Sequence, residues 1–135
     1  MRPSGHIVPV PPLRVLIVDT HDVFRVACSA LLRTEGLMVA DLTPSDDVVT
    51  FARTFEPRVT LIDPEPVDQS RNIVLRLRSL ARAPLVVVMS SAEPDRLTPV
   101  IRGLPFLAKA DVCAPAIRHA VAAARGESAA QAESG

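Results

Sequence analysis

Five short apolar runs alternate with amphipathic stretches along the 135-residue chain. The runs are continuous and rich in β-branched residues, as expected of strands that are buried on both faces. Between them, apolar residues recur every three or four positions, which predicts helices. A repeated order of strand and helix predicts an α/β domain, with a parallel sheet covered by helices on both faces. The expected strands are 14–19, 38–42, 59–63, 85–89 and 106–108.

The helix ends are predicted from capping and helix-breaking residues. The first helix ends near Gly36, and the second begins after Ser45 as its cap and stops at Pro57. The third carries a stripe of Ile73, Val74, Leu77 and Leu80. The fourth helix is expected to be short, because Pro94, Pro99 and Gly103 interrupt it. The last helix begins either with Asp111 as its cap or just before Pro115.

Composition sets the broad class of the protein. Hydrophobic residues make up 48% of the chain, enough for a core, and we expect one domain over 13–126 with flexible tails at 1–12 and 127–135. Fifteen basic and fifteen acidic residues give zero net charge, which argues against direct binding of nucleic acid. No apolar run reaches the ~18–20 residues of a membrane span. Two isolated cysteines and the absence of a signal peptide favour a reducing cytoplasm.

Candidate chemistry gathers directly after the predicted strands. Asp19, Asp63 and Ser90 lie at three strand ends, and Lys109, the single lysine, follows the fifth strand. In doubly wound sheets, ligands bind at the carboxyl ends of the strands. Two carboxylates about 5 Å apart repel by roughly 3 kcal/mol at an effective dielectric constant of 20, which a divalent cation or a lysine would offset. We therefore expect the ends of Asp19, Asp63 and Lys109 to converge within about 6 Å.

This set of residue types suits phosphorylation of a carboxylate. An aspartate would be the nucleophile, while a metal, a lysine and a hydroxyl neutralise the phosphoryl oxygens. Mg²⁺ fits such a site because it prefers oxygen ligands and retains several waters.

Four segments, in order and at matching spacing, resemble a response-regulator receiver domain. The likeness is to CheY-like domains, closest to the receivers of the LuxR/NarL-type family, and it covers residues 13–127. It implies a flavodoxin-like doubly wound sheet of five parallel strands, in the order 2-1-3-4-5. The segments that carry it are 15–25, 57–63, 86–91 and 106–109.

The resemblance also implies roles for single residues. Asp63 would be the phosphorylation site, and Asp19, Asp63 and the backbone carbonyl of Glu65 would hold Mg²⁺. Ser90 and Lys109 would bind the phosphoryl group, and Phe106 would move with the switch. The phosphoryl donor would be a sensor histidine kinase or a phosphotransfer protein, and the output an unidentified downstream protein.

The chain departs from the family pattern in ways that weaken the expected metal site. Thr20 stands where the family has a second acid, and losing even an outer partner costs a metal site roughly 10- to 100-fold in affinity. Asp22 could compensate in part, but we expect it to cap the first helix; we expect His21 to be exposed. The loop 64–68 is one residue shorter than the family's and lacks glycine. We expect no output domain after Gly126.

The favoured hypothesis is a stand-alone, atypical receiver in two-component or phosphorelay signalling, and not an enzyme. Its Mg²⁺-dependent phosphorylation at Asp63 would be conditional or weakened, and its output would pass through protein contacts. The alternatives are a phosphorylation-independent pseudo-receiver that acts as a docking module and a fully active single-domain receiver. A flavodoxin-like cofactor binder is disfavoured, because no phosphate-binding loop follows the first strand and no Trp or Tyr is present to stack on a flavin.

Overall fold

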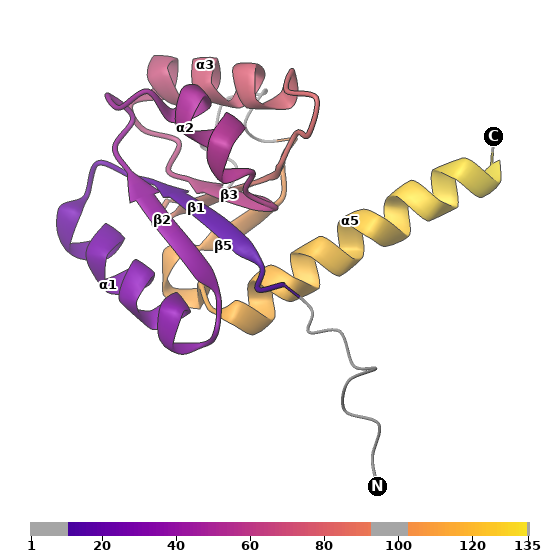
Figure 1. Ribbon diagram of the computed structural model, residues 1–135, viewed down its shortest axis with the longest axis horizontal. Coiled ribbons are helices and arrows are strands. Elements are labelled where there is room, and N and C mark those ends of the chain that lie inside the picture. Colours follow the sequence, from indigo (N-terminus) through magenta and orange to yellow (C-terminus); the bar gives the residue numbers. More distant parts are fainter. Residues whose placement is uncertain (1–10, 93–102, 135) are drawn as a thin grey trace, which may run out of the picture.

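The computed structural model describes residues 11–92 and 103–134, with side chains up to residue 126, and it has a five-stranded parallel sheet at its centre (Figure 1). The order is β2-β1-β3-β4-β5, which confirms the predicted fold class. Because the strands pair in parallel, the chain must cross a face of the sheet between strands, and helices make these crossovers. The strands are β1 (Arg14–Val18), β2 (Met38–Leu42), β3 (Val59–Ile62), β4 (Leu85–Ser90) and β5 (Phe106–Ala108).

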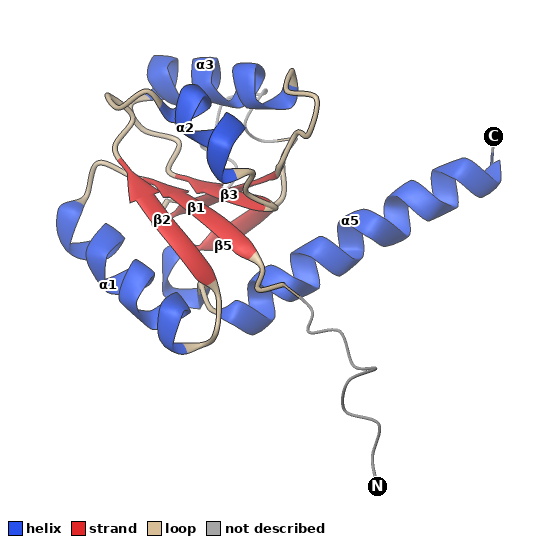
Figure 2. Cartoon of the chain, viewed as in Figure 1, coloured by secondary structure: helices blue, strands red, loops and turns tan. Residues whose placement is uncertain are grey.

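Helices cover both faces of the sheet, as Figure 2 shows. Helices α1 (Asp22–Thr34) and α5 (Ala114–Ser134) lie on one face. Helices α2 (Val48–Phe55) and α3 (Val67–Arg78) lie on the other. The predicted short fourth helix and most of the expected N-terminal tail fall in 93–102 and 1–10, outside the described residues.

The central strand β1 explains why its sequence is apolar without interruption. Successive side chains in a strand point to opposite faces, so β1 supplies two separate cores. Val15 and Ile17 pack in the core under α1 and α5, while Leu16 and Val18 pack in the core under α2 and α3. All four are fully buried, and burial of each such side chain stabilises the fold by about 1.5–3 kcal/mol.

Cys28 on α1 belongs to the first of these cores, as its place on the inner helix face predicts. Burial raises the pKa of its thiol to about 11, with the negative charge of Asp19 acting in the same direction. At neutral pH the side chain is therefore a small apolar residue and not a nucleophile.

Two helix starts differ from the prediction. The N-cap of α2 is Asp47, not Ser45, and its carboxylate accepts hydrogen bonds from the Thr50 backbone N–H (3.2 Å) and hydroxyl (2.8 Å). Ser45 lies two residues before this position, and its hydroxyl pairs with the Thr43 hydroxyl instead (2.9 Å). The N-cap of α1 is His21 and not Asp22, which is the first residue of the helix and whose carboxylate lies 2.7 Å from the Arg25 guanidinium.

The last helix begins at Ala114, so the start just before Pro115 is correct and the cap at Asp111 is wrong. Lys109–Asp111 instead form a separate 3₁₀ turn, η3. Glu35, at the end of α1, accepts a hydrogen bond from the Ala114 N–H through its carboxylate (3.0 Å). This contact from a distant segment supplies the negative charge that a helix start favours.

Helix α5 is longer than the sequence pattern predicts. It continues to Ser134 and projects beyond the sheet (Figure 1), so residues 127–134 belong to this helix. The alanine-rich composition of this segment accounts for its helix propensity. Among the described helices, none combines the length and the apolar character needed to cross a membrane.

Candidate functional site

The carboxyl ends of β1 and β3 bring two aspartates side by side. The strands pair in parallel with Val18 opposite Ile62, so the next residues, Asp19 and Asp63, lie at neighbouring strand ends. The Asp63 N–H donates to the Val18 carbonyl (3.0 Å), which continues the sheet ladder to this point. Both aspartates are buried. The two carboxylates therefore occupy the crevice where the strand order reverses.

Lys109 completes this group from the position directly after β5, which lies two strands away from β3. Its Nζ lies 2.8 Å from Asp19 Oδ2 and 2.7 Å from Asp63 Oδ2, and its side chain is 10% exposed. The ammonium also lies 4.6 Å from the centre of the Phe24 ring, within the range of a cation–π contact. The predicted convergence of the three charged side chains is confirmed.

These contacts shift two pKa values. Burial acts to raise the pKa of Asp19, but Lys109 and the backbone and side chain of His21 outweigh it, so the pKa lies below its ordinary value. Burial acts to lower the pKa of Lys109, but Asp19 and Asp63 outweigh it and raise that pKa. Each charge is therefore held ionised by its partners.

His21 is the site residue that sequence reasoning missed. Its side chain is 60% exposed, as predicted, yet its Nδ1 lies 2.8 Å from Asp19 Oδ1 and 3.8 Å from Asp63 Oδ2. The His21 backbone N–H also donates to Asp19 Oδ1 (2.8 Å). An aspartate commonly bonds the backbone two residues on, and that spacing is the signal that could have placed His21 in the site.

The donor set can be tested for a divalent cation. Asp19, His21 and Asp63 each offer a ligand atom, and these atoms lie within 4.8 Å of one another. Asp19 Oδ2 is buried and has no donor aligned for a hydrogen bond, although the Lys109 ammonium lies close to it. Two carboxylates fit Mg²⁺, and the imidazole also suits transition metals. A cation would share the oxygens that Lys109 contacts.

Two hydrogen bonds hold the carboxyl group and the backbone carbonyl of Asp63 in place. Its Oδ1 accepts a hydrogen bond from the Glu65 N–H (2.8 Å), and its backbone carbonyl accepts one from the Ser70 hydroxyl on α3 (2.8 Å). A hollow of about 890 Å³ opens above this carboxyl, with Glu65, Ser90 and Lys109 among its lining residues. The hollow offers room for a phosphoryl group.

The remaining predicted residues divide between the hollow and its surroundings. Ser90 ends β4, and its hydroxyl accepts a hydrogen bond from the Ala92 N–H (2.9 Å). Phe106 is half-buried against Val88 and is not one of the residues that line the hollow. Thr20 is exposed and also lies outside the lining.

Comparison with known proteins places the fold. No model of a known protein family matches the sequence, and no curated protein matches it. The structure resembles a response-regulator receiver domain (CheY-like) from Methylobacillus flagellatus, with a TM-score of 0.65 and 19% identity over 81% of this chain and 98% of that one.

Two further solved structures, one of an activated protein and one of a pseudo-receiver domain, have the same fold. SdrG from Pseudomonas melonis, in a BeF₃-activated conformation, gives a TM-score of 0.60 at 18% identity, over 84% of this chain and 98% of that one. The pseudo-receiver domain of the CikA protein gives 0.59 at 22% identity, over 80% of this chain and 92% of that one. This chain therefore has the fold shared by CheY-like receiver domains and pseudo-receivers.

Proposed function

We propose that this protein is an atypical receiver in two-component or phosphorelay signalling. Asp63 accepts a phosphoryl group from a sensor histidine kinase or a phosphotransfer protein in the cytoplasm, and the signal passes on through contacts with a downstream protein. The observation that supports this most strongly is the position of Lys109, whose Nζ lies within 2.8 Å of both Asp19 and Asp63 beneath the hollow.

The chemistry needs a positioned carboxylate and a way to neutralise charge. An oxygen of Asp63 forms a bond to phosphorus while the bond from phosphorus to the donor's histidine nitrogen breaks, and the imidazole keeps that electron pair. The Lys109 ammonium and the Ser90 hydroxyl stabilise the negative charge on the phosphoryl oxygens. The Glu65 N–H restrains the other carboxylate oxygen and so orients the nucleophile.

Asp19, Asp63 and the backbone carbonyl of Glu65 would hold Mg²⁺, which supplies further positive charge against the phosphoryl oxygens. Two features weaken this site. Thr20 offers no carboxylate, and Lys109 already pairs with both aspartates. We therefore propose that phosphorylation at Asp63 is conditional on the metal concentration or on a donor that displaces Lys109 from its present contacts.

Incubation with acetyl phosphate and Mg²⁺, followed by intact-mass measurement, tests the proposal. We expect an adduct that Asp63→Asn abolishes and that Thr20→Asp increases. Beryllofluoride should shift the amide resonances of Ser90 and Lys109 in the unmodified protein and leave them in place in Asp63→Asn. A mass adduct that persists in Asp63→Asn would contradict the assignment of Asp63.

A phosphorylation-independent pseudo-receiver is the second candidate, and the internal ion pairs of Lys109 with both carboxylates favour it. In that case the ammonium replaces the metal permanently and the domain serves as a docking module. Absence of any adduct, both in the unmodified protein and in Thr20→Asp, would select this function over the first.

A further inference from the structure

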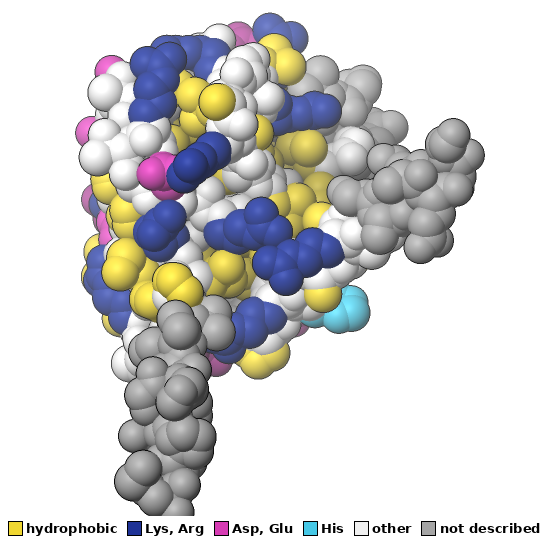
Figure 3. Space-filling model, turned by 45° about the vertical axis from the view of Figure 1, so that its right-hand side comes forward, with side chains coloured by type: hydrophobic (Ala, Val, Ile, Leu, Met, Phe, Trp, Pro, Cys, Tyr) yellow, Lys and Arg dark blue, Asp and Glu magenta, His cyan; other side chains and the backbone are white. Residues whose placement is uncertain are grey.

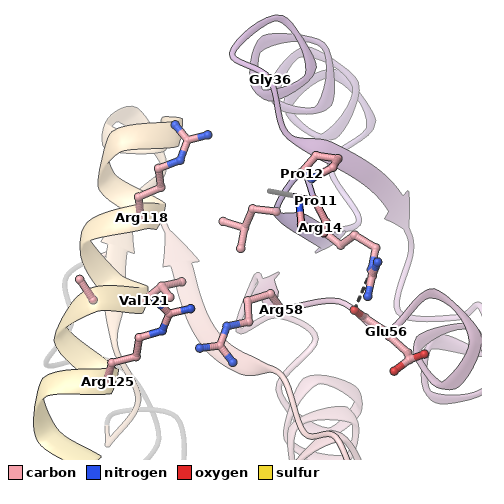
Figure 4. A pocket seen from close by; sticks show the side chains of 11 residues that line it. Pro11, Pro12, Arg14, Gly36, Glu56, Arg58, Arg118, Val121 and Arg125 are labelled. Carbon is pink, nitrogen blue, oxygen red and sulfur yellow. Dashed lines mark hydrogen bonds between the residues drawn. The ribbon is translucent and has the colours of Figure 1, made fainter. Parts of the chain in front are cut away.

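A second hollow lies at the opposite, amino-terminal edge of the sheet, and arginines dominate its charge. It measures about 700 Å³, and Figure 4 shows its lining residues. Among them are four arginines from three parts of the fold, which we call the arginine groove: Arg14, Arg58, Arg118 and Arg125. A smaller hollow of about 330 Å³ shares Arg58 and Arg125 with it, so the groove continues past these two side chains.

The fold fixes where these arginines lie. The Arg58 N–H donates to the Arg14 carbonyl (2.9 Å), and the Arg58 carbonyl accepts from the Leu85 N–H (2.9 Å), so Arg58 is tied to β1 and β4. Arg118 and Arg125 are seven residues apart on α5 and therefore share one helix face. Val121, between them on that face, is buried and contributes apolar surface.

Among the side chains that the structure describes, the positive charge of the groove is not balanced by nearby acids. Within the described residues, no carboxylate lies in ion-pair range of any of the four arginines. Glu56 lines the groove, but its carboxylate lies 2.5 Å from Arg82, and Arg14 contacts its backbone carbonyl instead (3.0 Å). Figure 3 shows basic side chains gathered around apolar ones on one face, with few acidic ones.

This concentration of charge is notable in a chain whose net charge is zero. Grouped cations raise the local concentration of anions, and arginine binds carboxylates through two parallel hydrogen bonds. In Figure 4 the guanidinium groups stand on separate walls and do not converge on one point, except that Arg58 and Arg125 extend toward each other. Such spacing suits several carboxylates along a chain better than one compact anion.

We propose that the arginine groove binds an acidic, partly apolar segment of a partner protein. Its glutamate or aspartate side chains pair with Arg58, Arg118 and Arg125, and its apolar side chains cover Val121 and Pro12. Nucleic acid is a poorer match, because none of the described residues that line the groove has an aromatic side chain to stack on bases. The interaction is separate from the Asp63 site and does not depend on phosphorylation.

Binding of a fluorescein-labelled peptide of repeated Glu-Leu-Glu-Ala units, measured by fluorescence anisotropy, tests this inference. We expect Arg58→Glu/Arg125→Glu to weaken binding at least about tenfold, a loss of about 1.4 kcal/mol. The matched control is Arg71→Glu/Arg78→Glu, which makes the same change in net charge at exposed positions on α3 and should change the affinity less than about twofold.

The peptide should also shift the amide resonances of Gly36 and Val121 and leave those of Ser90 and Lys109 unchanged. Arg58 and Arg125 are exposed, so the double variant should keep the circular dichroism spectrum of the folded protein. Equal losses in the two double variants would overturn the proposal, as would the absence of binding. Tighter binding of oligothymidylate or tripolyphosphate than of the peptide would also overturn it.

Discussion

The two edges of the sheet treat charge in opposite ways. At the carboxyl edge, Asp19 and Asp63 are buried, and the half-buried Lys109 pairs with both of them within 2.8 Å. At the amino edge, Arg58, Arg118 and Arg125 are exposed, and the described part of the chain holds no acid in ion-pair range of them.

The difference shows what each edge can do. A buried group of opposite charges costs desolvation, and it is stable only while every member is present. It therefore suits a site whose balance is changed by one added charge, such as a phosphoryl group. Exposed charges of one sign are solvated at little cost and suit capture of an oppositely charged partner.

Removing the cation that pairs with the two buried carboxylates should have the largest effect. Lys109→Met leaves two buried carboxylates without their partner, and we expect a loss of about 3–5 kcal/mol in the free energy of unfolding. Urea unfolding followed by circular dichroism measures this, because the chain lacks Trp and Tyr. Added Mg²⁺ should restore part of the loss, and Arg71→Met, on the exposed face of α3, is the control. An unchanged unfolding midpoint in Lys109→Met would show that the Lys109 ammonium does not contribute to stability.

Supplying the missing acid should strengthen Mg²⁺ binding at the carboxyl edge. Thr20→Asp adds a carboxylate beside the site, and we expect the affinity for Mg²⁺ to rise about 10- to 100-fold. Titration with Mg²⁺ followed by amide resonances measures the change. Thr20→Asn, which adds a side chain of the same size without the charge, should have a much smaller effect. Equal affinities in the two variants would mean that charge at this position is not what limits binding.

The stability of the carboxyl edge should depend on pH in two directions. The pKa of Asp19 lies below its ordinary value of 3.8, so its contribution is present above about pH 4 and is lost as pH falls through the lowered pKa. The pKa of Lys109 lies above its ordinary value of 10.5, so its contribution is present below that pH and is lost as pH rises further.

Unfolding midpoints measured from pH 2.5 to 11.5 should therefore form a plateau between these limits. Asp19→Asn should flatten the acid limb relative to the unmodified protein. An acid limb of the same slope in Asp19→Asn would mean that other carboxyl groups govern acid unfolding.

The smallest effect is expected at the amino edge. The ion pair of Arg82 with Glu56 is exposed, and such pairs contribute about 0.2–1 kcal/mol. Arg82→Gln should therefore change the unfolding midpoint far less than Lys109→Met, and 1 M salt should remove most of the difference. A loss of unfolding free energy in Arg82→Gln as large as that in Lys109→Met would contradict the proposed difference between the two edges.

Much of the fold is predictable because burial on both faces leaves a clear signal. The run at β1 is apolar throughout because Val15 and Ile17 face one core while Leu16 and Val18 face the other. The meeting of Asp19 with Asp63 follows from their places after adjacent parallel strands. These features depend on local pattern and on the general geometry of sheets, both of which a sequence carries.

Contacts that depend on single side chains were harder to predict. The choice of Asp47 over Ser45 as the cap of α2 depends on which oxygens reach Thr50. The cap of α5 comes from Glu35, 79 positions earlier in the chain, and no local pattern indicates it. His21 was expected to be exposed, and it is, but exposure of most of the ring did not exclude a nitrogen contact with Asp19.

The arginine groove was not predicted either, because it depends on residues that are distant in sequence. Arg14, Arg58 and Arg118 lie far apart in sequence, and each alone reads as a solvated surface residue. Only the parallel order of β1 and β3, with α5 packed beside them, brings them to one edge.

Cys28 can serve as a chemical probe of local opening at α1. Its thiol is buried under α1 with a pKa of about 11, so an alkylating reagent at neutral pH reaches it only when that helix lifts from the sheet. The rate at which Cys28 is labelled therefore measures how often α1 separates from the sheet. The half-buried Cys113 serves as an internal reference. In a chain without tryptophan or tyrosine, this sulfur can report how tightly α1 is held while phosphoryl analogues or acidic peptides bind elsewhere.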